Sequence, residues 1–257
     1  MDGKRSFYEF FAGGGMARAG LGKRWDCIFA NDFSAMKARV YAENWGSDHF
    51  IGGDVAEIST SRLPGRADLV WASFPCQDLS LAGKYLGLGD AKAEVMTRSG
   101  TFWPFWSLIR QLCHERRKPR TIVLENVAGA ITSRSGKDFA AICHALAEEG
   151  YRFGALTIDA IHFVPQSRPR LFFVAVDEHA DLPATLVKAD ANPLWCSDAL
   201  LVAQKRLSGA AARQCQLLGS VARFHRENGG SRLRHRTPYG PRRSGRPAGS
   251  GAALPRR

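Results

Sequence analysis

Short apolar runs alternate with segments of helical periodicity from residue 6 to about residue 150. Runs rich in β-branched and aromatic residues predict strands, and apolar residues three and four positions apart predict the helices between them. This alternation is typical of βαβ units, whose strands lie parallel in one sheet. The seven predicted strands are Ser6–Phe11, Trp25–Asn31, His49–Gly53, Ala67–Phe74, Thr121–Glu125, Arg152–Asp159 and Arg170–Val176.

The predicted helices are Ser34–Trp45, Phe102–Cys113 and Lys137–Glu149. The last of these has an apolar face that consists of Phe139, Ile142, Cys143 and Leu146. Only residues 160–169 separate the final two strands, which is too short for a helical crossover, so these strands should pair antiparallel. A mostly parallel seven-stranded sheet with a terminal antiparallel hairpin is the architecture of Rossmann-like α/β methyltransferases that use S-adenosylmethionine. Such a fold says little about function by itself.

The alternating pattern weakens after Val176. Leu200–Leu218 could form one or two helices, and from Gly229 onward the chain is rich in Gly, Pro, Ser and Arg, with too few apolar residues for a core. We therefore expect a catalytic domain over residues 1–180. A partial target-recognition region or helical remnant over 181–228 and a basic, disordered tail over 229–257 should follow.

The formal net charge of +12 comes from the end of the chain. Residues 1–204 contain 23 Lys+Arg and 23 Asp+Glu, whereas residues 205–257 contain 13 Lys+Arg and Glu227 as their single acid. A basic tail of this kind can bind a nucleic-acid backbone by displacing counterions from phosphate. It can equally be a solvated end without a partner.

Membrane, disulfide and metal chemistry are not indicated by the sequence. The chain has no apolar run long enough to span a bilayer and begins without the apolar stretch of a signal peptide, so we expect a cytoplasmic protein with no membrane partner. The six cysteines are scattered, with no CxxC pair and no pair of histidines at metal-ligand spacing. We therefore predict neither a disulfide framework nor a metal site.

A glycine cluster follows the first predicted strand, in the segment Phe10–Gly20 (FFAGGGMARAG). Glycines at the carboxyl end of a parallel strand let the backbone approach a ligand closely. The dinucleotide fingerprint requires a third glycine where Arg18 stands, which disfavours nicotinamide and flavin cofactors. Asp32 and Asp54 end the next two strands, where carboxylates can hold ribose hydroxyls and an adenine amino group. Together these features predict a nucleoside site, although a glycine cluster alone is as often a structural turn.

A second motif, Val70–Ser80 (VWASFPCQDLS), runs from a strand into a loop at Pro75. The proline stiffens the turn and would hold Cys76 at the carboxyl edge of the sheet, where active sites gather. A thiolate at that edge is a strong nucleophile, whereas most lone cysteines are inert.

Four motifs occur in the order of the cytosine-C5 methyltransferase family, which the chain resembles over about residues 6–176. They are the glycine cluster, Phe74–Gln77 (FPCQ), Glu125–Val127 (ENV) and Gln166–Arg170 (QSRPR). The resemblance implies that Cys76 adds to C6 of the target base and that Glu125 contacts N3 and the exocyclic amine. It also implies that Arg170 contacts O2, with Arg168 nearby.

The same resemblance implies S-adenosylmethionine as cofactor and double-stranded DNA as substrate. The residues expected to contact the cofactor are Phe11, Ala12, Gly13, Gly15, Asp32, Phe33 and Asp54. The residues expected to contact the nucleic acid are Gln77, Ser80, Asn126 and Gln166. Because C6 of a paired base is covered by its neighbours, the target nucleotide must leave the stack.

Elementary chemistry supports these residue types independently of the resemblance. C5 of cytosine is a poor nucleophile, but a thiolate added at C6 turns the ring into an enamine whose C5 can attack a methyl group on a sulfonium. A carboxylic acid at N3 and an arginine at O2 would stabilise the developing charge, which requires a buried, protonated Glu125. Outside this context Glu125 is an ordinary strand-end cap, and Arg168 and Arg170 are surface charges.

Three hypotheses about function stay open. The first is a monomeric DNA (cytosine-5) methyltransferase in a restriction-modification setting, with a cognate restriction endonuclease as a candidate partner. The second is a tRNA or RNA cytosine-C5 methyltransferase, because the four motifs do not separate the two substrates. The third is a truncated, inactive nucleic-acid-binding remnant, because the sequence after Val176 resembles neither of the last two motifs of the family.

Overall fold

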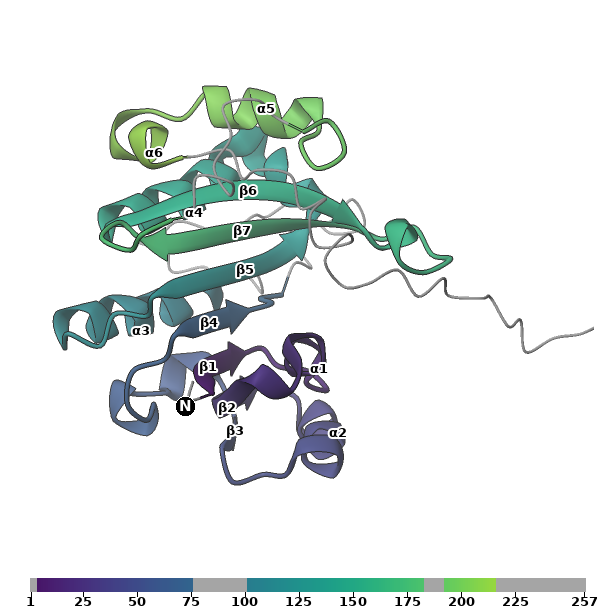
Figure 1. Cartoon of the computed structure of the whole chain (residues 1–257), viewed down its shortest axis with the longest axis vertical. Helices are drawn as coiled ribbons and strands as arrows, with labels where there is room; N and C mark the ends of the chain where they lie inside the picture. The colour runs from purple at the N-terminus through teal and green to yellow at the C-terminus, as the bar shows by residue number, and fades with distance from the viewer. Residues whose placement is uncertain (1–3, 76–100, 183–191, 216–257) are drawn as a thin grey trace, which may run out of the picture. The chain divides into compact units, whose positions relative to one another are not determined.

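The computed structural model describes residues 4–75, 101–182 and 192–215, which include one seven-stranded sheet with helices on both faces (Figure 1). The strands are β1 (Arg5–Phe10), β2 (Trp25–Asp32), β3 (Phe50–Gly52), β4 (Leu69–Ala72), β5 (Thr121–Val127), β6 (Tyr151–Asp159) and β7 (Pro169–Asp177). All seven predicted strands are confirmed, with small differences at their ends.

The strand order is β3-β2-β1-β4-β5-β7-β6. Strands β1 to β5 pair with one another in parallel. Strand β7 lies between β5 and β6 and is antiparallel to both, so the predicted terminal hairpin is confirmed. The chain builds the sheet outward from β1, first to β3 at one edge and then from β4 toward the other. The order therefore reverses between β1 and β4, and ligands of open α/β sheets bind in the crevice at such a reversal.

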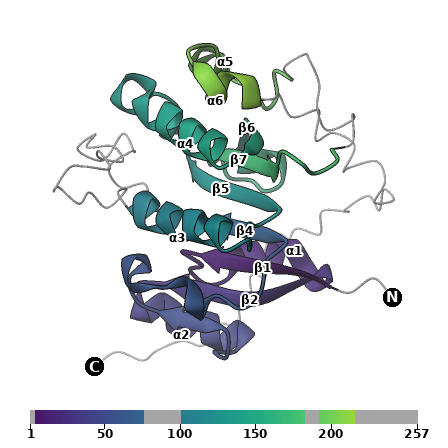
Figure 2. The same ribbon diagram turned by 90° about the vertical axis from the view of Figure 1, so that its left-hand side faces the viewer.

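Helices α3 (Phe102–His114) and α4 (Lys137–Glu148) lie on the same face of the sheet (Figure 2). Alternate strand residues point to opposite faces, and those on this face, among them Tyr8 and Ile122, join the helices in the larger of two apolar clusters. The predicted apolar face of α4 is confirmed, because all four of its side chains are buried. This layer forms most of the core.

Helices α1 (Met16–Leu21) and α2 (Ala35–Trp45) belong to the opposite face. Phe7 and Leu69, whose side chains alternate with those of the first face, pack there with Tyr41 of α2. On this second face the alternate residues of β5 and β7 are only partly buried. The described helices therefore leave the second face of β5 and β7 partly exposed.

The helical segment expected near residue 200 forms two short helices, α5 (Asp198–Lys205) and α6 (Gly209–Gln214). Leu200 and Ala211 are fully buried, and α6 packs against α4, so these helices extend the first layer. No helix in the described ranges is long and apolar enough to cross a membrane. Within the same ranges, no group of three or more His, Cys, Asp or Glu side chains could hold a metal ion.

Candidate active site

The glycine-rich turn joins β1 to α1 at the carboxyl end of β1. Gly13 and Gly15 have φ angles of +59° and +81°, a region that favours glycine. The Asp32 carboxylate, at the end of β2, accepts the Gly13 N–H through Oδ2 and the Ser34 N–H through Oδ1, each at 2.9 Å. Asp32 is buried, so the neighbouring strand holds this turn firmly against the sheet.

Gly15→Ala should destabilise the protein. A Cβ at this position would lie 2.3 Å from Nε1 of Trp45, and the same indole N–H donates to the Gly14 carbonyl at 3.0 Å. The added methyl group must therefore displace a side chain that supports the turn, at a φ that alanine rarely adopts. We expect the free energy of unfolding to fall by about 1–3 kcal/mol in urea denaturation.

Gly20→Ala is the matched control, because residue 20 lies within α1 and has nothing within 4 Å of an added Cβ. It should leave stability unchanged or raise it by roughly 0.4–1 kcal/mol through loss of unfolded-state entropy. A Gly15→Ala chain as stable as Gly20→Ala would show that Trp45 does not pack closely on the turn.

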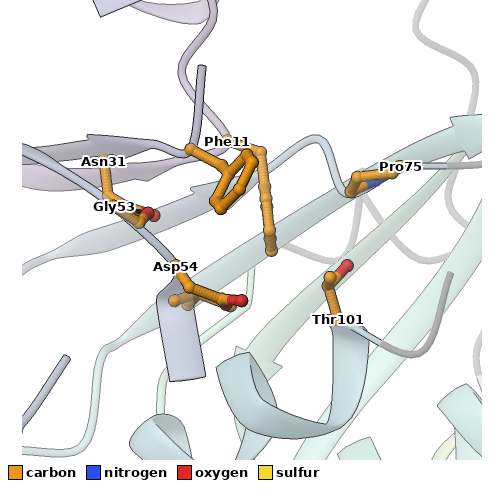
Figure 3. A pocket seen from close by; sticks show the side chains of 8 residues that line it. Phe11, Asn31, Gly53, Asp54, Pro75 and Thr101 are labelled. Atoms are coloured by element: carbon orange, nitrogen blue, oxygen red, sulfur yellow. Dashed lines mark hydrogen bonds between the residues drawn. The ribbon is translucent and has the colours of Figure 1, made fainter. Parts of the chain in front are cut away.

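A cavity of about 400 Å³ lies next to the turn, at the carboxyl ends of β1 to β3 (Figure 3). Its lining residues are Phe11, Asn31, Phe33, Gly53, Asp54, Val55, Pro75 and Thr101. Figure 3 shows the ring of Phe11 between the segment of Asn31 and Gly53 and the side of Pro75. Phe11 has a φ of +56°, which is uncommon outside glycine, and its ring meets Phe105 edge-on at 6.2 Å between centroids.

Three of the residues predicted to contact the cofactor, Phe11, Phe33 and Asp54, line this cavity together. Asn31 lines it as well, although we did not predict a role for it from the sequence. Its side-chain amide donates to the carbonyls of Ile51 (2.9 Å) and Gly53 (3.0 Å), which fixes the segment that leads to Asp54. The only signal in the sequence was its position beside Asp32 at a strand end.

A second cavity, of about 630 Å³, lies over the carboxyl ends of β1, β4 and β5. Phe11 lines both cavities, so the two adjoin at that residue. The lining of the second cavity includes Ala12, Gly13, Gly14, Trp71, Ser73, Glu125, Arg168 and Phe172. The glycine turn and two of the predicted catalytic residues therefore face one space.

Glu125 and Arg170 form an ion pair across two strands. Nε of Arg170 lies 3.0 Å from Oε1 of Glu125, because the antiparallel register places Arg170 opposite Val127, two residues beyond Glu125. The two side chains are 23% and 21% exposed, so solvent and ligands can reach the pair. Glu125 is thus less buried than we expected from the sequence, and a guanidinium accompanies its carboxyl group.

Asp159 organises the loop that carries Gln166 and Arg168. Its Oδ1 accepts the N–H groups of Ile161 (3.1 Å) and Arg168 (2.6 Å), and its Oδ2 accepts the Ser167 hydroxyl (2.8 Å). These hydrogen bonds hold the pKa of Asp159 below its usual value. Arg168 lines the second cavity, whereas the exposed Gln166 lines neither of the two cavities.

The family model for C-5 cytosine-specific DNA methylase matches residues 5–199. The chain belongs to the C-5 cytosine-specific DNA methylase family. The matched range contains both cavities and all four sequence motifs, so the predicted family and the Rossmann-like methyltransferase fold are confirmed.

Proteins named type II methyltransferases match about 70% of this chain. Type II methyltransferase M.BsuFI of Bacillus subtilis is 30% identical over 181 residues, which is 70% of this chain and 40% of that protein. Type II methyltransferase M.HaeII of Haemophilus aegyptius is 31% identical over 185 residues, covering 70% and 54%. The structure of S. pombe Dnmt2 methyltransferase has the same fold, with a TM-score of 0.53 at 19% identity, covering 70% and 51%. The chain spans about half the length of the curated relatives it matches.

Asn126 of this C-5 cytosine methylase chain is buried, with 2% of its surface exposed. Its side-chain amide donates to the Phe74 carbonyl at 3.4 Å, which ties β5 to the segment that leads from β4 toward Cys76. Its predicted contact with substrate stays a prediction. Cys76, Gln77 and Ser80 lie outside the described residues, and their predicted roles also stay predictions.

Proposed function

We propose that this chain transfers a methyl group from S-adenosylmethionine to C5 of cytosine in DNA. The observation that supports the proposal most is the second cavity, where the glycine turn faces Glu125 and Arg168. Arg170 does not line this cavity but forms an ion pair with Glu125, which does. A donor site and a group that can bind a pyrimidine edge are thereby within one space. Membership of the methylase family supports the same reaction.

The residues around the first cavity fit an adenosine group. Phe11, Phe33 and Val55 offer apolar surface to a purine, and the Asp54 carboxylate can accept a hydrogen bond from its amino group. The volume, about 400 Å³, is within the usual range of small-molecule sites. Asp32 would act on the cofactor through the turn, because both of its oxygens already accept backbone N–H groups. When bound, S-adenosylmethionine supplies an electrophilic methyl group for C5 of the base.

Cys76 is the proposed nucleophile, and it directly follows Pro75, which lines the first cavity. Addition of its thiolate to C6 of cytosine pushes electron density toward C5, N3 and O2, so that C5 becomes nucleophilic. After methylation, water or a base takes the C5 proton and the thiolate is eliminated, which restores the aromatic ring and the free cysteine. The base must be turned out of the DNA stack for C6 to be reached.

Glu125 and Arg170 would bind the edge of the turned-out base. The guanidinium can donate to O2, where negative charge builds as the thiolate adds, and the carboxyl group can share a proton with N3. In the free chain the two side chains bind each other at 3.0 Å, so their positions are set before the base arrives. Arg168, which lines the second cavity together with Glu125, would add positive charge for the target nucleotide.

Double-stranded DNA is the proposed substrate, in a cytoplasmic restriction-modification setting. Relatives named type II methyltransferases support this setting, and a cognate endonuclease would be the functional partner. We also propose that the chain acts as a monomer.

Methyl transfer to DNA is the test of the proposed function. The full chain, incubated with S-adenosylmethionine labelled with tritium in the methyl group, should incorporate label into duplex DNA and not into tRNA. Label in tRNA alone would favour an RNA substrate. The absence of label from both duplex DNA and tRNA would contradict the proposed activity and favour an inactive nucleic-acid-binding remnant.

A further inference from the structure

A polar network packs behind the glycine-rich turn, between α1, α2 and the segment before β3. Nη1 of Arg18 donates to the Tyr41 hydroxyl at 3.2 Å and also contacts Nε2 of His49. The Tyr41 hydroxyl lies 3.1 Å from the same His49 nitrogen, and Sγ of Cys27 lies 3.4 Å from the hydroxyl. None of these four residues lines either cavity described above, so the proposed reaction leaves the network without a role.

Arg18 connects this network to Trp45, which supports the turn, and to Glu9 of β1. Its guanidinium lies over the ring of Trp45, 4.9 Å from the centroid, and the indole N–H of Trp45 donates to the Gly14 carbonyl at 3.0 Å. Its backbone N–H donates to Oε1 of Glu9 in β1 at 3.4 Å. A change at Arg18 therefore reaches the turn through Trp45 as well as through β1.

The contacts specify the protonation state of His49. A guanidinium can only donate, so Nε2 of His49 must present a lone pair to Arg18, and the imidazole must be neutral. Burial and the charge of Arg18 both lower the pKa of His49, against smaller opposing effects of Asp48 and Asp26. The lowered pKa agrees with the neutral ring that the geometry requires.

Two further titratable groups, Tyr41 and Cys27, belong to the network, and a third, Glu9, contacts it through Arg18. Burial raises the pKa values of Tyr41 and Cys27, so the hydroxyl and the thiol both stay neutral near physiological pH. Burial also raises the pKa of Glu9 to about 7, although backbone N–H groups of Arg18 and Ala17 act in the other direction. Glu9 must therefore be controlled for in any measurement of pH dependence.

We propose that Arg18 and neutral His49 are positioning residues for the methyl-donor site, and that they hold the turn Gly13–Gly15 in place through Trp45. The inference rests on the proposed function, because it assigns the turn to S-adenosylmethionine. Protonation of His49 removes the acceptor for Arg18 and places two cations together. The intact network lowers the pKa of His49. Its stabilisation of the turn is therefore complete above about pH 6.5 and is lost progressively as the pH falls below that value.

The affinity of the full chain for S-adenosylmethionine, measured by calorimetry at about pH 8 and about pH 6, tests this proposal. Arg18→Ala should raise the dissociation constant roughly tenfold at the higher pH, if the turn is then competent about a tenth of the time. Arg18→Lys, which keeps the cation over Trp45, should recover part of the loss. Wild-type chain should bind more weakly at the lower pH.

His49→Gln separates positioning from simple stability. A glutamine oxygen can accept from Arg18 and cannot be protonated in this range, so this variant should bind well at both pH values. Glu9→Gln, which removes the titration of Glu9 near pH 7, should retain the weakening at low pH. Wild-type affinity in Arg18→Ala, or an unchanged pH dependence in His49→Gln, would overturn the proposal. The His49→Gln measurement tests the proposal even if Arg18→Ala does not fold.

Failure of the proposed function can be distinguished from failure of this positioning proposal. If the wild-type chain does not bind S-adenosylmethionine, the cofactor assignment is wrong. The amide hydrogen exchange of Gly13–Gly15 then decides whether the network holds the turn. Faster exchange in Arg18→Ala than in wild type would support that role, and equal exchange would overturn it.

Discussion

Cys76→Ala should abolish methyl transfer to duplex DNA. Without thiolate addition at C6, C5 of cytosine stays a poor nucleophile, and the fold can only bind the two substrates side by side. We expect the rate to fall by roughly 10,000-fold or more, the scale seen when a covalent nucleophile is removed. Tritium incorporation from labelled S-adenosylmethionine measures the loss, and calorimetry should show that cofactor binding is retained.

Cys113→Ala is the matched control for a lost thiol. Cys113 is a free cysteine of α3 that is partly buried and lines neither of the two cavities, so its removal should leave the rate within about twofold. Its thiol is also a poor nucleophile, because burial raises its pKa to about 11.

A duplex that contains 5-fluorocytosine tests directly whether Cys76 forms a covalent bond to C6 of the base. Fluorine at C5 cannot leave as a proton does, so the thiolate cannot be eliminated after methylation and the adduct persists. Wild type and Cys113→Ala should form a covalent complex that survives denaturing electrophoresis, and Cys76→Ala should not. An adduct in Cys76→Ala would assign the nucleophile to another residue.

Strands near the centre of the sheet, such as β4, were predictable because a parallel sheet is buried on both faces there. Its strands appear in the sequence as short, nearly continuous apolar runs, and the β4 segment LVWA is one of these. The hairpin of β6 and β7 followed from loop length alone, since ten residues cannot form a crossover helix. Both signals are local, and neither requires knowledge of the packing.

The direction of individual side chains was harder to predict. We expected the fifth strand to end at Glu125, but β5 continues to Val127. Asn126 therefore lies within the strand, and alternation turns its side chain into the buried layer under Phe74, opposite to Glu125. A shift of one residue thus separates a group that faces the cavity from one that supports the site from behind.

The network of Arg18 and His49 had no signal in the sequence at all. In the sequence Arg18 stands where a dinucleotide fingerprint has glycine, and His49 is the first residue of a predicted strand, and neither feature indicates a contact between them. Their contact joins α1 to the segment before β3, 31 positions apart, and depends on how α1 sits on the sheet. Such tertiary contacts cannot be inferred from periodicity or spacing.

Glu125→Gln should lower the rate of methyl transfer by roughly 100- to 1,000-fold, within the range of general acid catalysis. The amide has nearly the same shape, but it cannot share a proton with N3 as the thiolate adds to C6. The loss should appear in kcat more than in the KM for DNA, because charge at N3 develops only during the reaction. Steady-state transfer from labelled cofactor measures both constants.

The ion pair of Arg110 and Glu149 offers a matched control. Its Nε–Oε1 distance is also 3.0 Å, yet both residues lie away from the two cavities, so Glu149→Gln should leave kcat unchanged. Arg170→Ala should itself lower kcat strongly. The double variant, Glu125→Gln with Arg170→Ala, should lower kcat by less than the product of the two single reductions, because the pair acts on one base. A Glu125→Gln chain with wild-type kcat would exclude Glu125 as the acid and leave its ion pair with Arg170 a structural contact between β5 and β7.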